Sequence, residues 1–135
     1  MHVVATIDVP DLASGIAFYS DALGISERVR PFPIFVVMTN GDARIGLMQK
    51  DEGTRPAPGS SDVRSYARHW TPVHLDFHVK DIDATLAAIQ ASGGVIEQHA
   101  GGGNLPRVAF CCDPFGHGFC VIGPRDQTTK SPLPG

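Results

Sequence analysis

Histidine and aspartate side chains alternate along one short stretch near the middle of the chain. His74, Asp76 and His78 are separated by the apolar residues Leu75 and Phe77. Residues two apart on a β-strand lie on the same face, so the three polar groups would share one face. An imidazole oriented by a carboxylate can serve as a general acid or base, which makes these three the candidate catalytic residues. The alternative is a polar network that only satisfies its own hydrogen bonds.

A thiol adds a second kind of chemistry. Cys120 lies in the segment GHGFCVI, where it could act as a nucleophile or a soft metal ligand. The sequence identifies no basic neighbour for it, so we favour a small buried hydrophobic residue. The other two cysteines, Cys111 and Cys112, are interpreted as packing residues. The three show neither the spacing of a zinc knuckle nor that of a secreted disulfide framework.

Further polar or adaptable side chains are predicted on the same side of the molecule. Asp8 lies on the outward face of a predicted strand over residues 3–9, and Arg44 and Met48 alternate along another over residues 43–49. Arg44 could pair with Asp8 or with an anionic ligand. The alternative for Arg44 is a solvated charge at the sheet edge.

The only tryptophan, Trp70, ends a stretch over residues 51–70 that is rich in glycine, proline and serine. The stretch has no hydrophobic period and is predicted to be a linker or mobile loop. Its length is unusual inside a compact domain, which favours a functional role. With Tyr66 and Arg68, Trp70 could cover a pocket and stack on a ligand, or it could cover a module or dimer junction.

Two similar sets of elements would hold these side chains. Each set begins with an alternating strand, continues with a helix that an aspartate caps, and ends with three short strands. The first set is predicted over residues 3–9, 11–24, 27–30, 34–39 and 43–49, and the second over 73–79, 81–94, 95–98, 107–112 and 118–122.

The two sets match when one is shifted by 70 residues. The matches fall on strand faces, the helix cap, the apolar stripe of the helix and its glycine stop, so each has a structural reason. They are Val3/Val73, Val9/Val79, Asp11/Asp81, Ala17/Ala87 and Gly24/Gly94. We infer a duplicated βαβββ module. Because buried polar groups need partners or water, the polar faces of the two first strands are expected to line a cup.

Composition limits the function classes. The chain has 135 residues, of which 42% are hydrophobic and 19% charged, and a net charge of −3. These values are typical of one soluble domain and give no basic surface for nucleic acid. No apolar run is long enough to cross a membrane and no signal peptide is evident, so a cytoplasmic protein is predicted. We expect a single domain over residues 1–135, with module one at about 1–50, a loop at 51–71, module two at about 72–123 and a fraying tail at 124–135.

Three segments together resemble a known superfamily. TIDVPDLASGIAFYSDALGI, VHLDFHVKDIDATLAAIQASGGV and CDPFGHGFCVIGP are similar to the vicinal oxygen chelate superfamily, which includes glyoxalase I, bleomycin-resistance proteins and extradiol dioxygenases. The glyoxalase-like single-domain members are the most similar. The resemblance implies an α+β fold of tandem βαβββ modules that form a cupped mixed sheet. It also implies a small-molecule ligand and a homodimer.

The resemblance also indicates where metal ligands would lie. Superfamily enzymes carry one ligand on the first and last strand of each module, which by register gives Val4, Gly46, His74 and Cys120 here. Valine offers no ligand and glycine only its backbone, so only His74 and Cys120 remain. Asp76 or His78 could add a third from the same strand face, although side chains two apart on a strand stand roughly 6.5–7 Å apart. A catalytic metal normally has three protein ligands, so none is favoured.

We therefore predict a protein that binds a small organic molecule in its cup without a catalytic metal. Its partners would be that ligand and a second copy of the chain, with no nucleic acid and no membrane. The alternative is an enzyme, either a divalent-metal-dependent glyoxalase-like lyase or isomerase or a ring-cleaving dioxygenase. The predicted ligand-binding residues are Asp8, Arg44, Met48, Trp70, His74, Asp76, His78 and Cys120.

Overall fold

The first module forms one four-stranded sheet and one helix. In the computed structural model, which describes residues 1–125, its elements are β1 (Ala5–Val9), α1 (Leu12–Leu23), β2 (Ser26–Phe32), β3 (Phe35–Asn40) and β4 (Ala43–Gln49). The Asp11 side chain accepts a hydrogen bond from the backbone N–H of Ser14 and caps α1. Gly24 ends the helix in the left-handed region at φ 66°. Both signals were predicted from the sequence.

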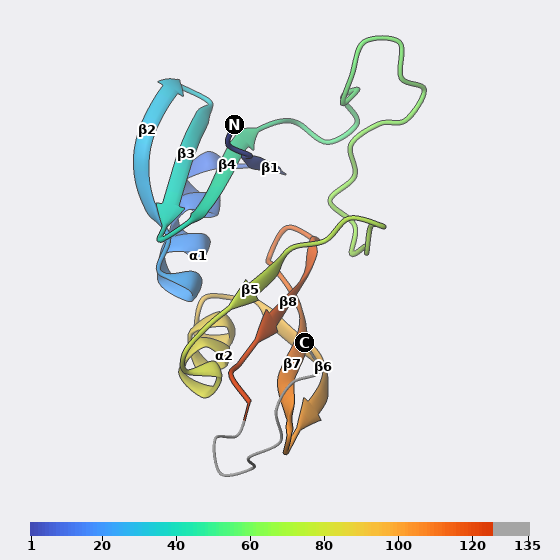
Figure 1. Ribbon diagram of the computed structural model, residues 1–135. Coiled ribbons are helices and arrows are strands. Elements are labelled where there is room, and N and C mark those ends of the chain that lie inside the picture. The colour runs from blue at the N-terminus through green and yellow to red at the C-terminus, as the bar shows by residue number, and fades with distance from the viewer. Residues whose placement is uncertain (126–135) are drawn as a thin grey trace.

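The second module repeats this arrangement (Figure 1). Its elements are β5 (Asp76–His78), α2 (Ile82–Ala91), β6 (Val95–Gly102), β7 (Leu105–Cys112) and β8 (Gly118–Ile122). Asp81 caps α2 as Asp11 caps α1. The strand predicted over 73–79 shortens to the three residues of β5.

The two sheets have equivalent strand orders, β1-β4-β3-β2 and β5-β8-β7-β6. In each, the first strand is parallel to the last, while the other neighbours are antiparallel. Thr6 pairs with Gly46 in the first sheet and Asp76 with Cys120 in the second. This register makes Gly46 and Cys120 equivalent positions, as the sequence comparison of the modules predicts. The α+β class with two mixed sheets is thereby confirmed.

One hydrophobic core joins the modules. α1 and α2 pack against each other, and the ring of Phe18 from α1 lies 6.4 Å from that of Phe119 on β8. The largest fully buried side chains come from both modules, namely Val9, Tyr19, Ile25, Val36, Met38, Leu47, Ile89, Cys111 and Val121. β1 and β5 are edge strands of their sheets, so the modules meet at two sheet edges.

The segment between β4 and β5 forms neither a helix nor an extended strand, as predicted. In Figure 1 it leaves the first sheet, runs out to one side and returns to the second sheet. Two backbone hydrogen bonds close its outer part into a loop: Gly53 N–H donates to the carbonyl of Arg64, and Arg64 N–H donates to the carbonyl of Thr54. Of the predicted tail, residues 126–135 lie outside the described part. Among the described residues, none belongs to a helix long and apolar enough to cross a membrane.

Candidate functional site

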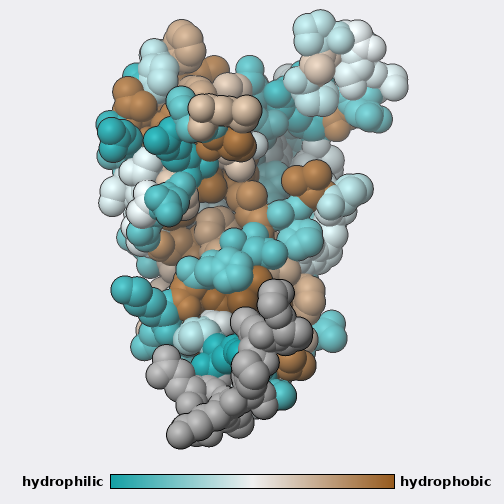
Figure 2. All heavy atoms as spheres, viewed as in Figure 1, coloured by the Kyte–Doolittle hydropathy of each residue, from teal (hydrophilic) through white to brown (hydrophobic). Residues whose placement is uncertain are grey.

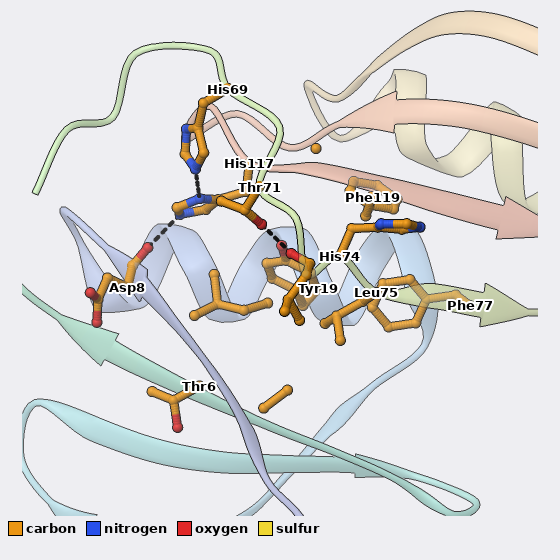
Figure 3. A pocket seen from close by; sticks show the side chains of 14 residues that line it. Thr6, Asp8, Tyr19, His69, Thr71, His74, Leu75, Phe77, His117 and Phe119 are labelled. Carbon is orange, nitrogen blue, oxygen red and sulfur yellow. Dashed lines mark hydrogen bonds between the residues drawn. The ribbon is translucent and has the colours of Figure 1, made fainter.

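A cavity of about 390 Å³ lies where the edge strands of the two sheets meet. We call it the seam cavity. Consecutive residues of β1, and of the segment that leads into β5, line this cavity. They can do so because each strand lies at the edge of its sheet, where one side of its backbone has no neighbouring strand. Its lining residues are Ala5, Thr6, Ile7, Asp8, Tyr19, His69, Thr71, Val73, His74, Leu75, Phe77, His117, Gly118 and Phe119. Figure 3 shows the labelled members.

This location modifies one sequence expectation. The polar faces of the two first strands, rather than their apolar faces, were expected to line the cup. Val73, Leu75 and Phe77 nevertheless line the seam cavity, and Val73 is 81% exposed. Leu75 and Phe77 also pack against the core, in which Val9 is fully buried.

Two histidines form the polar end of the seam cavity. Nδ1 of His117 lies 3.3 Å from Nε2 of His69, and the rings are nearly perpendicular. Nε2 of His117 donates to the backbone carbonyl of Asp8 at 2.7 Å, and Nδ1 of His69 donates to that of Ala67 at 2.8 Å. We call His69 and His117 the histidine pair. It links β1, the linker and the turn before β8, and Figure 3 shows the contacts of His117 with His69 and with Asp8.

A buried carboxylate shapes the turn that carries His117. Asp113 is 2% exposed, and its Oδ1 accepts the backbone N–H groups of Phe115 and His117. Its Oδ2 accepts the hydroxyl of Tyr19 at 2.6 Å. Burial and the neighbouring Asp113 carboxylate raise the pKa of Tyr19 well above its usual value, so the phenol stays protonated.

Asp8 forms an ion pair with the linker. Nε of Arg64 donates to the Asp8 carboxylate at 2.7 Å, in a pair whose side chains are 13% and 29% exposed. Arg64 also donates to Thr54 and to the carbonyl of Arg55, which fixes the linker. Of the alternatives for Arg44, pairing with Asp8 does not occur, because Arg44 is exposed and lies four residues along β4 from Met48, the neighbour of Asp8, roughly 13 Å away.

Three potential metal ligands come together on the second sheet. One ligand atom from each of His74, Asp76 and Cys120 lies within 4.8 Å of the others, and we call these residues the donor cluster. Nε2 of His74 is 3.2 Å from Oδ1 of Asp76. The ends of these two side chains therefore come closer than the roughly 6.5–7 Å spacing of residues two apart on a strand, and His74 lies before the start of β5.

The thiol of the donor cluster is protonated in this environment. Burial, and then the Asp76 carboxylate through its charge and a hydrogen bond, raise the pKa of Cys120 to about 11. The donor set nevertheless suits a borderline-soft divalent ion, since one imidazole, one carboxylate and one thiol leave a fourth position open. Binding an ion would release the thiol proton.

The equivalent position of the first module cannot hold a metal. A Cβ on Gly46 would lie 2.7 Å from Oγ1 of Thr6 and 3.0 Å from the ring of Phe35. The Phe35 ring therefore occupies the space where a ligand side chain would project. Val4, the counterpart of His74, offers no donor atom. These observations agree with the predicted loss of ligands in module one.

Trp70 packs on the second sheet beside the donor cluster. A Cβ on Gly118 would meet the indole at 2.5 Å, so the glycine lets the indole lie directly on the backbone. The indole centroid is 5.9 Å from the ring of His74, and the Arg68 guanidinium stacks on its other side at 4.9 Å. Arg68 also forms an ion pair with Glu97, and the Trp70 N–H donates to the same carboxylate.

The remaining predicted residues lie away from the seam cavity. Arg44 is exposed, and Met48 lies between Asp8 and Phe35 in the first sheet. His78 lines a smaller depression together with Asp76, whose side chain contacts that of His74. Sequence reasoning missed the histidine pair. The position of His117 in the quoted segment CDPFGHGFCVIGP, directly before a cup-facing strand, was an available signal.

Comparisons of the sequence with known proteins identify the family of the chain. The model of the glyoxalase-like domain family matches residues 4–122, so the chain belongs to this family and to the glyoxalase/bleomycin resistance/dioxygenase superfamily. The chain is 35% identical over 124 residues to CFP32 of Mycobacterium bovis and Mycobacterium tuberculosis, whose name marks it as a provisional glyoxylase. The match covers 89% of this chain but only 42% of CFP32.

Solved structures show the same fold at low identity. A glyoxalase-related enzyme from Fulvimarina pelagi superposes with a TM-score of 0.70 at 14% identity, covering 92% of this chain and 88% of that one. The fosfomycin resistance protein FosX from Listeria monocytogenes gives 0.66 at 19% identity, covering 92% and 91%.

Proposed function

We propose that this chain binds a small organic molecule in the seam cavity and that binding needs no metal. The observation that carries the proposal is the cavity itself, which combines an apolar wall with the histidine pair at one end. Its volume of about 390 Å³ lies within the usual range for small-molecule sites. Leu75, Phe77 and Phe119 supply apolar surface, which is the usual main component of such sites.

A ligand screen read by thermal unfolding tests the proposal. A ligand present at about one hundred times its dissociation constant stabilises the folded state by about 2.7 kcal/mol. Compounds of anionic, neutral, aromatic and sugar-like classes should include at least one that raises the unfolding temperature. No stabilisation in any class would contradict the proposal.

Two exposed valines provide a matched pair of variants. Val73→Trp places an indole at the seam cavity, whereas Val95→Trp changes an exposed valine on β6 that does not line it. Because both side chains are more than half exposed, neither substitution should disturb the core. We expect Val73→Trp to weaken binding of any hit and Val95→Trp to leave it unchanged. Equal affinities in the two variants would place the ligand elsewhere.

The donor cluster supports a second candidate, a divalent-metal-dependent lyase, isomerase or dioxygenase. His74, Asp76 and Cys120 would hold the ion, and a bound ion would polarise neighbouring oxygen atoms of a substrate. The test is metal content after dialysis against manganese, iron, nickel and zinc salts. One ion per chain, lost in both His74→Ala and Asp76→Asn, would support the enzyme. Binding that survives both substitutions would exclude this site.

A homodimer in the cytoplasm completes the proposal. Figure 2 shows hydrophobic residues exposed across the middle of one face and near its top. Among the described residues, large exposed hydrophobic side chains include Val3, Val29, Phe32, Ile34 and Val73. A second copy of the chain would cover part of this apolar surface. Light scattering after size exclusion should give twice the mass of 14.4 kDa; a monomer at micromolar concentration would contradict the dimer.

A further inference from the structure

The outer nitrogens of the histidine pair have fixed protonation. Nδ1 of His69 faces the carbonyl oxygen of Ala67, and Nε2 of His117 faces that of Asp8. A carbonyl oxygen can only accept a hydrogen bond, so each of these two nitrogens must carry a proton. The tautomers follow from the hydrogen-bond partners, which is how such assignments are made.

The inner nitrogens then face each other without a donor if both rings are neutral. A neutral imidazole carries one proton, and both protons are already used on the outer nitrogens. Nε2 of His69 and Nδ1 of His117 would place two lone pairs 3.3 Å apart. One additional proton between them converts this repulsion into an N–H···N hydrogen bond with a charged donor. The geometry therefore favours a pair that shares one proton and carries one positive charge.

No acidic side chain that lines the seam cavity in the described chain is free to compensate that positive charge. From β1, the Asp8 carboxylate is already paired with Arg64 of the linker at 2.7 Å. From the turn before β8, Asp113 accepts hydrogen bonds from Tyr19 and from backbone N–H groups. Also from the linker, the Tyr66 ring is 6.1 Å from that of His117, and burial raises the pKa of this phenol, so it stays neutral.

The rest of the seam cavity adds no second cation. No lysine or arginine is among its lining residues in the described chain, and His74, the third histidine there, lies 3.2 Å from the Asp76 carboxylate. The cavity thus presents an apolar body and one positive end. Asp8, the only acidic lining residue described, has its charge offset by Arg64.

We propose that the ligand of the seam cavity is a small molecule with an apolar body and one anionic group, such as a carboxylate, directed at the histidine pair. This inference rests on the proposed function and adds the chemical class of the ligand. Charge attraction would supply the selectivity, because the ring nitrogens are engaged with each other and with backbone carbonyls. The same attraction would be lost when the shared proton leaves.

Benzoate and benzamide are suitable probes, since they have the same ring and similar size but differ in charge. Their dissociation constants can be measured by NMR titration of the full chain. We expect benzoate to bind about tenfold more tightly than benzamide at neutral pH, a difference of about 1.4 kcal/mol.

Substitutions identify the source of the preference. His69→Gln cannot share a proton with His117, so it should abolish the benzoate preference. The matched control is His99→Gln, because His99 is exposed on β6 and does not line the seam cavity. This variant should retain the benzoate preference. His117→Gln is a second test variant, to be used if His69→Gln disturbs the structure of the linker.

The outcomes separate this inference from the proposed function. If neither probe binds at millimolar concentration, the anionic-ligand inference is overturned, whereas the proposed function is decided by the wider ligand screen. If both probes bind equally, the cavity binds small molecules but the anionic class is wrong. A benzoate preference that persists in folded His69→Gln and His117→Gln proteins would also overturn the inference, because the histidine pair would not be its source.

Discussion

Replacing Tyr19 with phenylalanine tests the buried bond that shapes the turn carrying His117. The Tyr19 hydroxyl is the partner of Asp113 Oδ2, at 2.6 Å, and the two residues are 1% and 2% exposed. In the described chain no buried side-chain nitrogen or oxygen lacks a partner. The variant would create such an atom on a carboxylate, which costs about 2–3 kcal/mol of unfolding free energy. For a domain of this size, the melting temperature should fall by about 8–12 °C.

The matched control is Tyr66→Phe. The Tyr66 hydroxyl donates to the neutral carbonyl of Lys50 at 2.6 Å in a partly exposed position, so water can replace it and the expected loss is about 1 kcal/mol. Urea unfolding followed by circular dichroism gives both values by linear extrapolation. A loss below about 0.5 kcal/mol for Tyr19→Phe, or equal losses in the two variants, would refute the reasoning that a buried carboxylate oxygen depends on Tyr19.

Three further predictions concern titration and glycine positions. Burial raises the pKa of the Cys111 thiol from 9.0 to about 12. The contribution of this protonated thiol to the free energy of unfolding is therefore complete below pH 9 and is lost as the pH rises toward 12. The urea midpoint of unfolding should fall over this pH range, and it should fall less in Cys111→Ala. Gly118→Ala should displace the indole of Trp70, which a red shift in the emission of the single tryptophan would report; unchanged emission would contradict the close contact. Gly46→Glu should destabilise the fold by about 1–3 kcal/mol through its clash with Thr6 and should create no metal binding, as metal analysis and urea unfolding can check.

The fold could be predicted from the sequence because its determinants are local. Asp11 and Asp81 cap their helices through hydrogen bonds to residues three positions later, and Gly24 ends the first helix by its own backbone conformation. Strand alternation and hairpin signals act over similarly short distances. The repeat then placed these signals in a common register. The predicted and observed limits of the last strand in each module, 43–49 and 118–122, are identical.

The site was less predictable because it depends on contacts between distant segments. Asp8 forms its ion pair with Arg64, which lies 56 residues away in the linker, and the members of the histidine pair are 48 residues apart in the sequence. Neither periodicity nor spacing indicates which linker residue returns to the sheet edge. The shortening of β5 has a similar origin, because the backbone of His69 pairs with that of His117 and accepts the N–H of Gly118, where the strand was expected to extend. His74 of the donor cluster therefore lies outside the regular strand.

The divergence of the two modules separates the two candidate sites physically. The donor cluster lies entirely within module two, since Phe35 fills the equivalent space in module one. The seam cavity, in contrast, needs β1 and the β5 segment together, with the histidine pair connecting them through the carbonyl of Asp8. A substitution that separates the edge strands should therefore abolish ligand binding in the cavity while leaving any metal binding intact. His74 contributes to both sites, so a molecule in the cavity would lie beside an ion held by the donor cluster. Metal-dependent ligand affinity would consequently indicate one combined site, whereas independent affinities would assign the chemistry to the cavity alone.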